Sequence, residues 1–244
     1  MILASIDIES TGLDKQNDRI VEMGLVLYST GRKKILESIG FLVQSDGVAI
    51  TEEITALTGI TQDAVDRFGY TQGDALDTFN AYVEQADAVI GHNTTWFDLP
   101  MIRNTAKRLG VNLSPIKLSI DTMTDIPGVK GEQLITMAAK HGFVNPNQHS
   151  AEDDAKSVIK LIQNYDIDKI VERAQSPTVV ILSHQDRSQA ANKAGRKAGF
   201  RWSGEFRVWW QAIKEMDLPS LSSKVPFAIS IAPKEINLEQ LREN

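Results

Sequence analysis

The order of apolar segments constrains the fold of this chain more than any other feature of its sequence. Residues 2–8, 19–28 and 34–43 each have the apolar content of a buried strand, and Gly31 stands where a hairpin turn would join the last two. Helical and strand-like segments then alternate up to residue 164. This order predicts an α/β fold with a mixed sheet, in which an antiparallel start is followed by parallel strands and helices flank the sheet.

The later elements follow from spacing and from turn residues. We expect helices over 71–85, 98–109, 131–141 and 153–164, and strands over 86–91 and 118–122. Ser176-Pro177 then interrupts the pattern. Beyond it we expect a small α+β module with a strand over 179–183, a helix over 188–198, a hairpin over 200–210 and a last strand over 227–231. The predicted domains are therefore residues 1–175 and a C-terminal appendage of residues 178–244.

Composition excludes several classes of protein. The chain has no cysteine, so disulfide frameworks, thiolate zinc sites and cysteine nucleophiles are excluded. Its amino terminus has no basic segment before the first apolar run, and no window approaches ~18 uninterrupted apolar residues. We therefore expect no signal peptide, no membrane contact and a cytoplasmic location. Charge is divided unevenly, because residues 1–177 have a net charge of −9 and residues 178–244 a net charge of +3.

Asp7-Ile8-Glu9 closes the first predicted strand. Strand side chains alternate, so the carboxylates of Asp7 and Glu9 project from the same face and repel each other unless a cation lies between them. A hard divalent ion such as Mg²⁺ or Mn²⁺ prefers oxygen ligands of this kind. An Asp-x-Glu pair taken alone also fits a solvent-exposed strand end.

Two further polar clusters lie farther along the chain. His92-Asn93 follows a predicted strand, and Asp98 opens the next helix, where an acid also stabilises the first turn. His149 lies in a loop five residues before Asp154, so a base on the loop and an acid on a helix can converge. Each cluster alone is also typical of ordinary loop and helix-start residues.

Together, Asp7-x-Glu9-Ser-Thr-Gly, His92-Asn93 with Phe97-Asp98, and His149-x4-Asp154 resemble the three motifs of the DEDDh branch of the DnaQ-like 3′→5′ exonucleases. The resemblance covers residues 2 to about 165 and includes a connector at residues 57–61. It implies a ribonuclease H-like sheet. Two details differ or need assignment: four residues separate Asn93 from Asp98 where many members have three, and Asp153 adjoins Asp154.

The resemblance also implies a mechanism and a set of site residues. Two divalent metal ions, Mg²⁺ or Mn²⁺, would be held by four acids, and His149 would act as general base. The acids are Asp7, Glu9, Asp98 and Asp154. The substrate would be a nucleic acid with a free 3′ end, cleaved to nucleoside 5′-monophosphates. Its terminal nucleotide would meet Ser10, Thr11, Gly12 and Leu13, with Asn93 and Trp96 as further contacts, whereas Phe97 is expected to fill core.

The appendage combines basic and aromatic residues. Residues 187–214 hold seven basic side chains and one acid, with three tryptophans interleaved. Cations and aromatic rings fit a surface that tracks phosphates and stacks bases. Candidate accessory contacts are Arg196, Lys197, Arg201 and Trp202. A small tryptophan core beneath a solvated basic helix, or a contact with a protein partner or a second copy, fits the same pattern.

Four functions fit these features. The first is a metal-dependent 3′→5′ exonuclease, acting on single-stranded DNA in preference to RNA because the appendage vaguely resembles a module of phage and mobile-element proteins. The second is an RNA-trimming exoribonuclease similar to RNase T or oligoribonuclease. The third is a binding module that has lost its chemistry, although no catalytic position carries a neutral residue. The fourth is a polymerase proofreading subunit. The sequence does not predict the oligomeric state.

Overall fold

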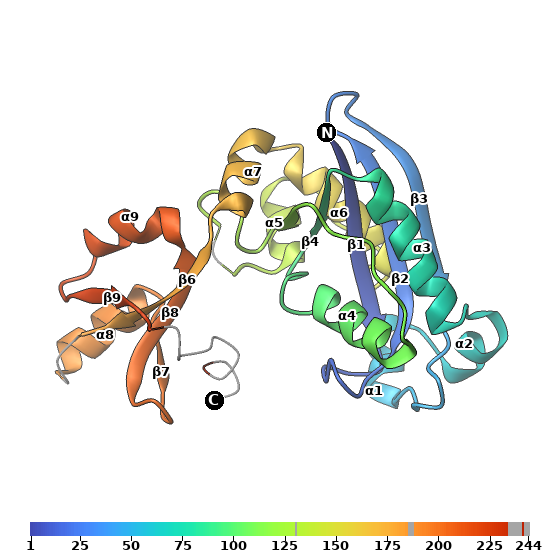
Figure 1. The fold of residues 1–244 in the computed structure, drawn as a ribbon, viewed down its shortest axis with the longest axis horizontal. Helices are drawn as coiled ribbons and strands as arrows, with labels where there is room; N and C mark the ends of the chain where they lie inside the picture. Colours follow the sequence, from blue (N-terminus) through green and yellow to red (C-terminus); the bar gives the residue numbers. More distant parts are fainter. Residues whose placement is uncertain (130, 185–187, 234–240, 242–244) are drawn as a thin grey trace. The chain divides into compact units, whose positions relative to one another are not determined.

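The computed structural model describes residues 1–129, 131–184, 188–233 and 241, and the chain forms two compact units. The first unit comprises Met1–Ala174 and the second Gln175–Asn244. Figure 1 shows the ribbon of both.

The first unit contains five strands and seven helices within the described residues. Its strands are β1 (Ile2–Ser10), β2 (Ile20–Ser29), β3 (Lys34–Leu42), β4 (Ala88–Gly91) and β5 (Ser119–Asp121). Its helices are α1 (Glu52–Thr58), α2 (Gln62–Phe68), α3 (Gln72–Gln85), α4 (Asp98–Leu109), α5 (Leu134–Lys140), α6 (Ala151–Ile162) and α7 (Ile167–Gln175).

The strands form one mixed sheet in the order β3-β2-β1-β4-β5. β1 pairs antiparallel with β2, and β2 with β3, whereas β4 runs parallel to β1 and β5 parallel to β4. The predicted fold class, with its antiparallel start and parallel continuation, is confirmed. Because β1, β4 and β5 are parallel, their carboxyl ends meet at one edge of the sheet, where polar groups from each can converge.

Helices cover both faces of this sheet (Figure 1). One apolar cluster joins Ala4, Ile6 and Ile8 of β1 to α3 and α4, and a second joins Leu3 of β1 to α5, α6 and α7. Alternate residues of β1 therefore face opposite layers. By this alternation Asp7 and Glu9 lie on the face that α6 covers, together with Ser5, whose hydroxyl donates to the carbonyl of Ala155 on α6 at 2.9 Å.

Two glycines let the start of α6 approach the sheet closely. A methyl group at Gly24 of β2 would lie 2.1 Å from the backbone carbonyl carbon of Ala151, and one at Gly40 of β3 would lie 2.7 Å from Cβ of Glu152. Gly24 is the register partner of Asp7. The glycine on β2 thus brings the amino-terminal turn of α6 next to the acidic end of β1.

The structure contains three helices of the first unit that the sequence pattern does not predict. Helices α1 and α2 have seven residues each, and Val65 is their one buried residue, so they carry almost no apolar periodicity. Threonine caps their amino termini instead, because the hydroxyls of Thr51 and Thr61 accept N–H groups of the first turn. Helix α7 follows α6 after a short turn and buries Ile170.

The second unit is a four-stranded antiparallel sheet with helices. Its order is β7-β8-β6-β9, so β7 is an edge strand. A core around Ile181, Phe200 and Leu221 lies against one face. The elements are β6 (Thr178–Ser183), α8 (Gln189–Lys197), β7 (Arg201–Ser203), β8 (Val208–Lys214), the 3₁₀ turn η1 (Glu215–Asp217), α9 (Leu218–Ser222) and β9 (Ile229–Ile231).

Among the described residues, no helix has the length and apolar character needed to cross a membrane. The cytoplasmic location expected from the sequence stays a prediction.

We predict that Gly24→Ala destabilises the first unit. The added methyl group meets backbone atoms of Ala151, which cannot rotate away, so α6 must move off the sheet. We expect a loss of about 3 kcal/mol or more in the free energy of unfolding, measured by urea denaturation followed by circular dichroism. Gly31→Ala is the matched control, because nothing lies within 4 Å of a methyl group there. Equal stability of the two variants would contradict this account of the contact.

Candidate active site

The carboxylates of Asp7, Glu9, Asp98 and Asp154 come from three elements of the first unit. Asp7 and Glu9 lie near the end of β1, Asp98 begins α4, and Asp154 lies in the first turn of α6. Asp98 is 3% exposed, and its Oδ1 accepts the backbone N–H of Ile8 at 3.0 Å. That bond ties the start of α4 to β1 between the two acids of the strand.

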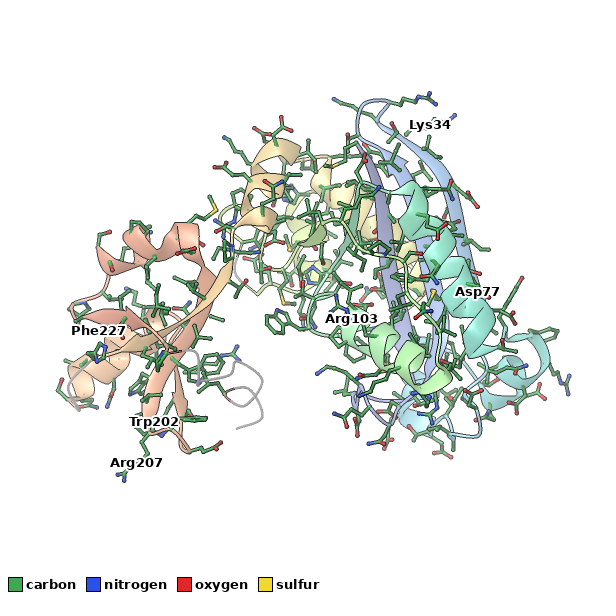
Figure 2. All side chains as sticks on the ribbon, in the orientation of Figure 1. Lys34, Asp77, Arg103, Trp202, Arg207 and Phe227 are labelled. Carbon is green, nitrogen blue, oxygen red and sulfur yellow. The ribbon has the colours of Figure 1, made fainter. Side chains whose placement is uncertain are left out.

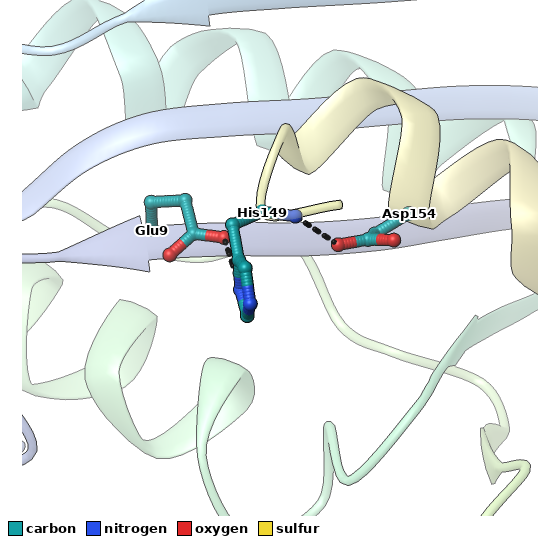
Figure 3. A group of neighbouring side chains, drawn as sticks. All are labelled: Glu9, His149 and Asp154. Carbon is teal, nitrogen blue, oxygen red and sulfur yellow. Dashed lines mark hydrogen bonds and ion pairs between the residues drawn. The ribbon is translucent and has the colours of Figure 1, made fainter. Parts of the chain in front are cut away.

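Asp154 is held by two donors from the loop before α6. Its Oδ1 accepts Nδ2 of Asn145 at 2.8 Å, and its Oδ2 accepts the backbone N–H of His149 at 3.0 Å. Figure 3 shows Asp154 beside His149 and Glu9. One ligand atom from each of these three residues lies within 4.8 Å of the other two. The α6 acid and the β1 acid therefore face a common point.

His149 occupies a left-handed backbone conformation at the edge of this cluster. Its φ is 63°, an uncommon value for a residue with a side chain. Its imidazole is 44% exposed, and Nδ1 lies 3.9 Å from Oε1 of Glu9 (Figure 3). The ring is therefore within reach of the acids and of solvent, and residues kept in such sparsely populated conformations cluster at functional sites.

Burial is the main reason why the pKa values of all four acids are raised. Burial raises the pKa of Asp7 well above its usual range, and the charges of Asp98, Asp154 and Glu9 add to the effect. Burial, together with the charges of Glu22, Asp154 and Asp98, raises the pKa of Glu9 to about 8. The pKa values of Asp98 and Asp154 are also raised, in each case chiefly by burial. The protein's own groups therefore offset little of the negative charge of these carboxylates.

A divalent cation fits this donor set. Within the described part of the chain, no Lys or Arg side chain forms a salt bridge with any of the four acids, and His149 is the one basic side chain that pairs with any of them. Partly buried carboxylate oxygens gathered without a cation are the ligands that Mg²⁺ and Mn²⁺ prefer. A bound ion would offset the cost of burying these charged groups and the repulsion between them.

The loop after β4 is shaped by a buried acid that sequence analysis did not single out. Asp121, at the end of β5, accepts the N–H groups of Asn93 at 2.8 Å and Thr95 at 3.1 Å. Asn93 has a φ of 62°, a left-handed conformation that asparagine tolerates. Burial raises the pKa of Asp121. Asp121 therefore fixes the turn that leads from β4 to Asp98.

The turn after β1 places the residues predicted to meet the substrate end. The Ser10 hydroxyl donates to the carbonyl of Gly12 at 2.6 Å, and the Thr11 hydroxyl donates to Asp18 at 2.8 Å. A methyl group at Gly12 would lie 2.4 Å from Oδ2 of Asp18, so a glycine fits there. Leu13 is 82% exposed, which leaves its side chain free to contact a ligand.

The remaining predicted contacts lie in two places. Trp96 is partly buried, and Phe97 packs against the core below α3 and α4, as expected from the sequence. The basic and aromatic candidates Arg196, Lys197, Arg201 and Trp202 belong to the second unit. Arg187, which contributes to the basic count of that segment, lies outside the described residues.

Glu22 and Asn145 are further polar residues of the site that sequence analysis missed. Glu22 is the register partner of Glu9, and its Oε2 accepts the N–H of Ala151 at the start of α6 at 3.1 Å. Burial raises the pKa of Glu22. An acid in the apolar run of residues 20–28 is a detectable signal for Glu22. No comparable signal marks Asn145, which is 9% exposed and acts through a contact nine residues away.

Comparisons with known proteins agree with this geometry. The family described as "Exonuclease" matches residues 4–162. A protein named 3'-5' exonuclease DinG from Staphylococcus saprophyticus is 30% identical over 165 residues, which are 65% of this chain and 17% of the relative. A protein named DNA polymerase III PolC-type from Clostridium perfringens is 31% identical over 159 residues, 64% of this chain and 11% of the relative. The chain therefore spans less than a fifth of the length of these relatives.

A similar fold is found among solved structures. The nuclease domain of 3'hExo, described as a DEDDh family member bound to rAMP, superposes with a TM-score of 0.58 at 20% sequence identity. The match covers 67% of this chain and 90% of that domain. At this identity the likeness concerns the fold, and the sheet order above agrees with it.

We predict that without divalent ions the protein loses stability as the pH rises from about 4.5 to about 8. The unfolded chain releases the Glu9 proton near the usual pKa of 4.5, whereas the folded chain holds it to about 8. The folded state therefore binds more protons over this interval, and the free energy of unfolding falls with rising pH. Thermal unfolding in EDTA across this range measures the effect.

Glu9→Gln should reduce this slope, and added Mg²⁺ or Mn²⁺ should stabilise the wild type more at pH 8 than at pH 5. A slope in EDTA that is unchanged in Glu9→Gln would contradict the account.

We predict that Asn145→Ala weakens Mn²⁺ binding by roughly 10- to 100-fold, because Asp154 loses the amide that orients its carboxylate. Isothermal titration calorimetry measures the affinity. Asn147→Ala is the matched control, since the Asn147 amide bonds Asp153 at 2.8 Å in the same way but on the neighbouring acid. Equal losses in the two variants would show that the Asn145 contact has no special role.

Proposed function

The chain belongs to the exonuclease family that matches its residues 4–162, and we propose that it is a metal-dependent 3′→5′ exonuclease. Its substrate is the 3′ end of a nucleic acid, and the preferred substrate in this proposal is single-stranded DNA. The reaction hydrolyses the last phosphodiester bond and releases a nucleoside 5′-monophosphate.

One observation carries the proposal: Glu9, Asp154 and a partly exposed histidine face a common point, and the charges of Asp98, Asp154 and Glu9 act on the buried Asp7. Glu9, His149 and Asp154 place ligand atoms within 4.8 Å of one another, and Asp98 is tied to the backbone between Asp7 and Glu9. A group of acids this poorly compensated costs stability, so a purely structural role gives no reason for it. Cation binding at this place gives a reason for such a group.

Two divalent ions, Mg²⁺ or Mn²⁺, are the cofactors that we assign to Asp7, Glu9, Asp98 and Asp154. Such ions stabilise the charge that develops on the attacking and leaving oxygens of a phosphodiester during in-line displacement. The protein holds two of these carboxylates in place: the N–H of Ile8 bonds Asp98, and the N–H of His149 and the amide of Asn145 bond Asp154.

His149 is the general base in this proposal. A histidine can accept a proton near neutral pH, and its ring needs access both to the water that attacks and to solvent that later takes the proton. The imidazole beside Glu9, at 44% exposure, has both. The proton of the attacking water passes to the ring as the new P–O bond forms, and the bond to the leaving 3′ oxygen breaks.

The turn from Ser10 to Leu13 receives the terminal nucleotide. The exposed Leu13 side chain lies under its base, and the internal hydrogen bonds of Ser10 and Thr11 keep the turn in shape. Asn93 and Trp96, in the loop before Asp98, are further contacts for the terminal nucleotides. A closed turn at the end of β1 is what would make the enzyme act from an end rather than within a strand.

We propose DNA rather than RNA as the substrate because one of the similar proteins is named as a DNA polymerase. A DNA polymerase III of the PolC type is 31% identical over 159 residues, although the solved 3'hExo domain is bound to rAMP. Discrimination between the two sugars depends on contacts to the ribose 2′-hydroxyl. The test therefore includes both nucleic acids.

We predict that Asp154→Asn abolishes cleavage and Asp153→Asn does not. Asp154 faces Glu9 and His149, whereas Asp153 bonds Asn147 and lies 3.7 Å from Nζ of Lys156. The assay uses single-stranded DNA and RNA of equal sequence, labelled at either end, with Mg²⁺, Mn²⁺ or EDTA. The wild type should shorten DNA from the 3′ end with either ion, and Asp154→Asn should lower the rate at least about 100-fold.

His149→Ala should lower the cleavage rate roughly 10²- to 10⁴-fold. It should keep its metal affinity, since a general base acts on the proton rather than on the ion. Faster cleavage of RNA would move the proposal to an exoribonuclease. Binding of the oligonucleotides without cleavage under every metal condition would overturn it in favour of a non-catalytic binding module.

A further inference from the structure

The second unit presents a tryptophan at its edge strand. Trp202 of β7 is 49% exposed, and Figure 2 labels it beside the β7–β8 hairpin. Its ring packs edge-on against Trp209 of β8, with ring centroids 5.8 Å apart, and the two residues are register partners. Trp209 packs against the core of the unit, so it anchors Trp202 without covering it.

Cations of α8 adjoin these rings. The guanidinium of Arg196 lies 5.7 Å from the centre of the Trp209 ring, and Lys193 lines a shallow open hollow with Arg196, Gln189 and Asn192. We call Lys193, Arg196, Trp209 and Trp202 the Trp202 surface. It joins one face of a helix to an exposed aromatic ring.

The charges of this surface are available to a ligand. Lys193 and Arg196 are exposed, and neither forms a salt bridge with any residue that the structure describes. Strand alternation turns Arg201, the neighbour of Trp202 in β7, toward the opposite side of the sheet. Arg201 is therefore not on the side of the tryptophan, whereas Arg196 of α8 lies over the Trp209 ring that packs against it.

We propose that the Trp202 surface binds the single-stranded part of the substrate, away from the 3′ end that is cleaved. A base stacks on Trp202, and Arg196 and Lys193 contact the phosphates beside it. The proposal rests on the proposed exonuclease function and names what the second unit adds to it.

Charge complementarity favours a polyanion with exposed bases as the occupant. Residues 178–244 have a net charge of +3, whereas residues 1–177 have a net charge of −9 and repel phosphates wherever bound metal ions do not offset that charge. Aromatic rings next to unpaired cations are the usual means of holding single strands without reading their sequence. A single strand offers unstacked bases to such a ring, which a duplex does not.

The first experiment measures binding by fluorescence anisotropy in EDTA, where cleavage stops. The probe is an oligothymidylate of about 20 nucleotides, labelled at its 5′ end and added to the full chain. Trp202→Ala should raise the Kd roughly 5- to 100-fold, and Trp202→Phe should restore most of the affinity. Phe68→Ala is the matched control, because Phe68 of α2 is an exposed aromatic of the first unit, 72% exposed.

Charge variants test the role of α8. Arg196→Ala should weaken binding and lower the slope of log Kd against log salt by about one. Arg201→Ala removes the same charge from the other side of β7 and should have the smaller effect. Thermal unfolding of each variant checks that the second unit stays folded.

A second experiment separates this proposal from the proposed function. Trp202→Ala should lower kcat/KM about 5-fold or more for the long oligonucleotide and by a clearly smaller factor for a substrate of about three nucleotides. Failure of the wild type to cleave either substrate would overturn the exonuclease function but not the binding result. Wild-type affinity in folded Trp202→Ala would overturn the role of the Trp202 surface and point to a protein partner for it.

Discussion

The close approach of α6 to the antiparallel part of the sheet is the contact on which the candidate site depends. It is possible because Gly24 and Gly40 leave no side chain beneath the first turn of the helix. Glu22, on the same strand face as Gly24, bonds the first backbone N–H of α6, and the Ser38 hydroxyl bonds Glu152. Asp154 is carried to the end of β1 by these contacts. A helix standing off at the usual distance would leave the acids of β1 without their partner.

The close approach of α6 brings acidic side chains together, which is electrostatically unfavourable. Backbone N–H groups supply most of the hydrogen bonds that these carboxylates accept. Four acids with raised pKa values lie in a small volume, and the donors that the described residues supply are mainly N–H groups at the ends of elements, with one amide from Asn145. Such donors hold the carboxylates of Asp98 and Asp154 in place without neutralising them as an Arg or Lys would. The arrangement keeps the oxygens available to a cation, so local instability and metal binding have the same origin.

Sequence patterns predicted the parts of this structure that depend on periodicity and spacing. The antiparallel start and parallel continuation of the sheet follow from the order of the apolar runs, and α4 was predicted with its observed bounds because Asp98 and Gly110 mark its ends. Helices α1 and α2 were missed because they bury almost no apolar surface and depend on threonine caps. Glu22 and Asn145 were missed for another reason: their contacts with Ala151 and Asp154 exist only once the chain is folded. The assignment of each site residue to a chemical role stays a prediction.

The first unit is acidic and the second is basic, and this difference bears on how the proposed polyanionic substrate is bound. In the proposed function an acidic unit would attract its substrate only through bound ions, and a single strand has one 3′ end but many internal phosphates. Binding energy placed on internal phosphates and bases raises the local concentration of the end without adding groups to the crowded acidic site. In the proposed function such contacts are made equally before and during hydrolysis, so they would improve capture of long substrates and leave the chemical step to the carboxylates and His149.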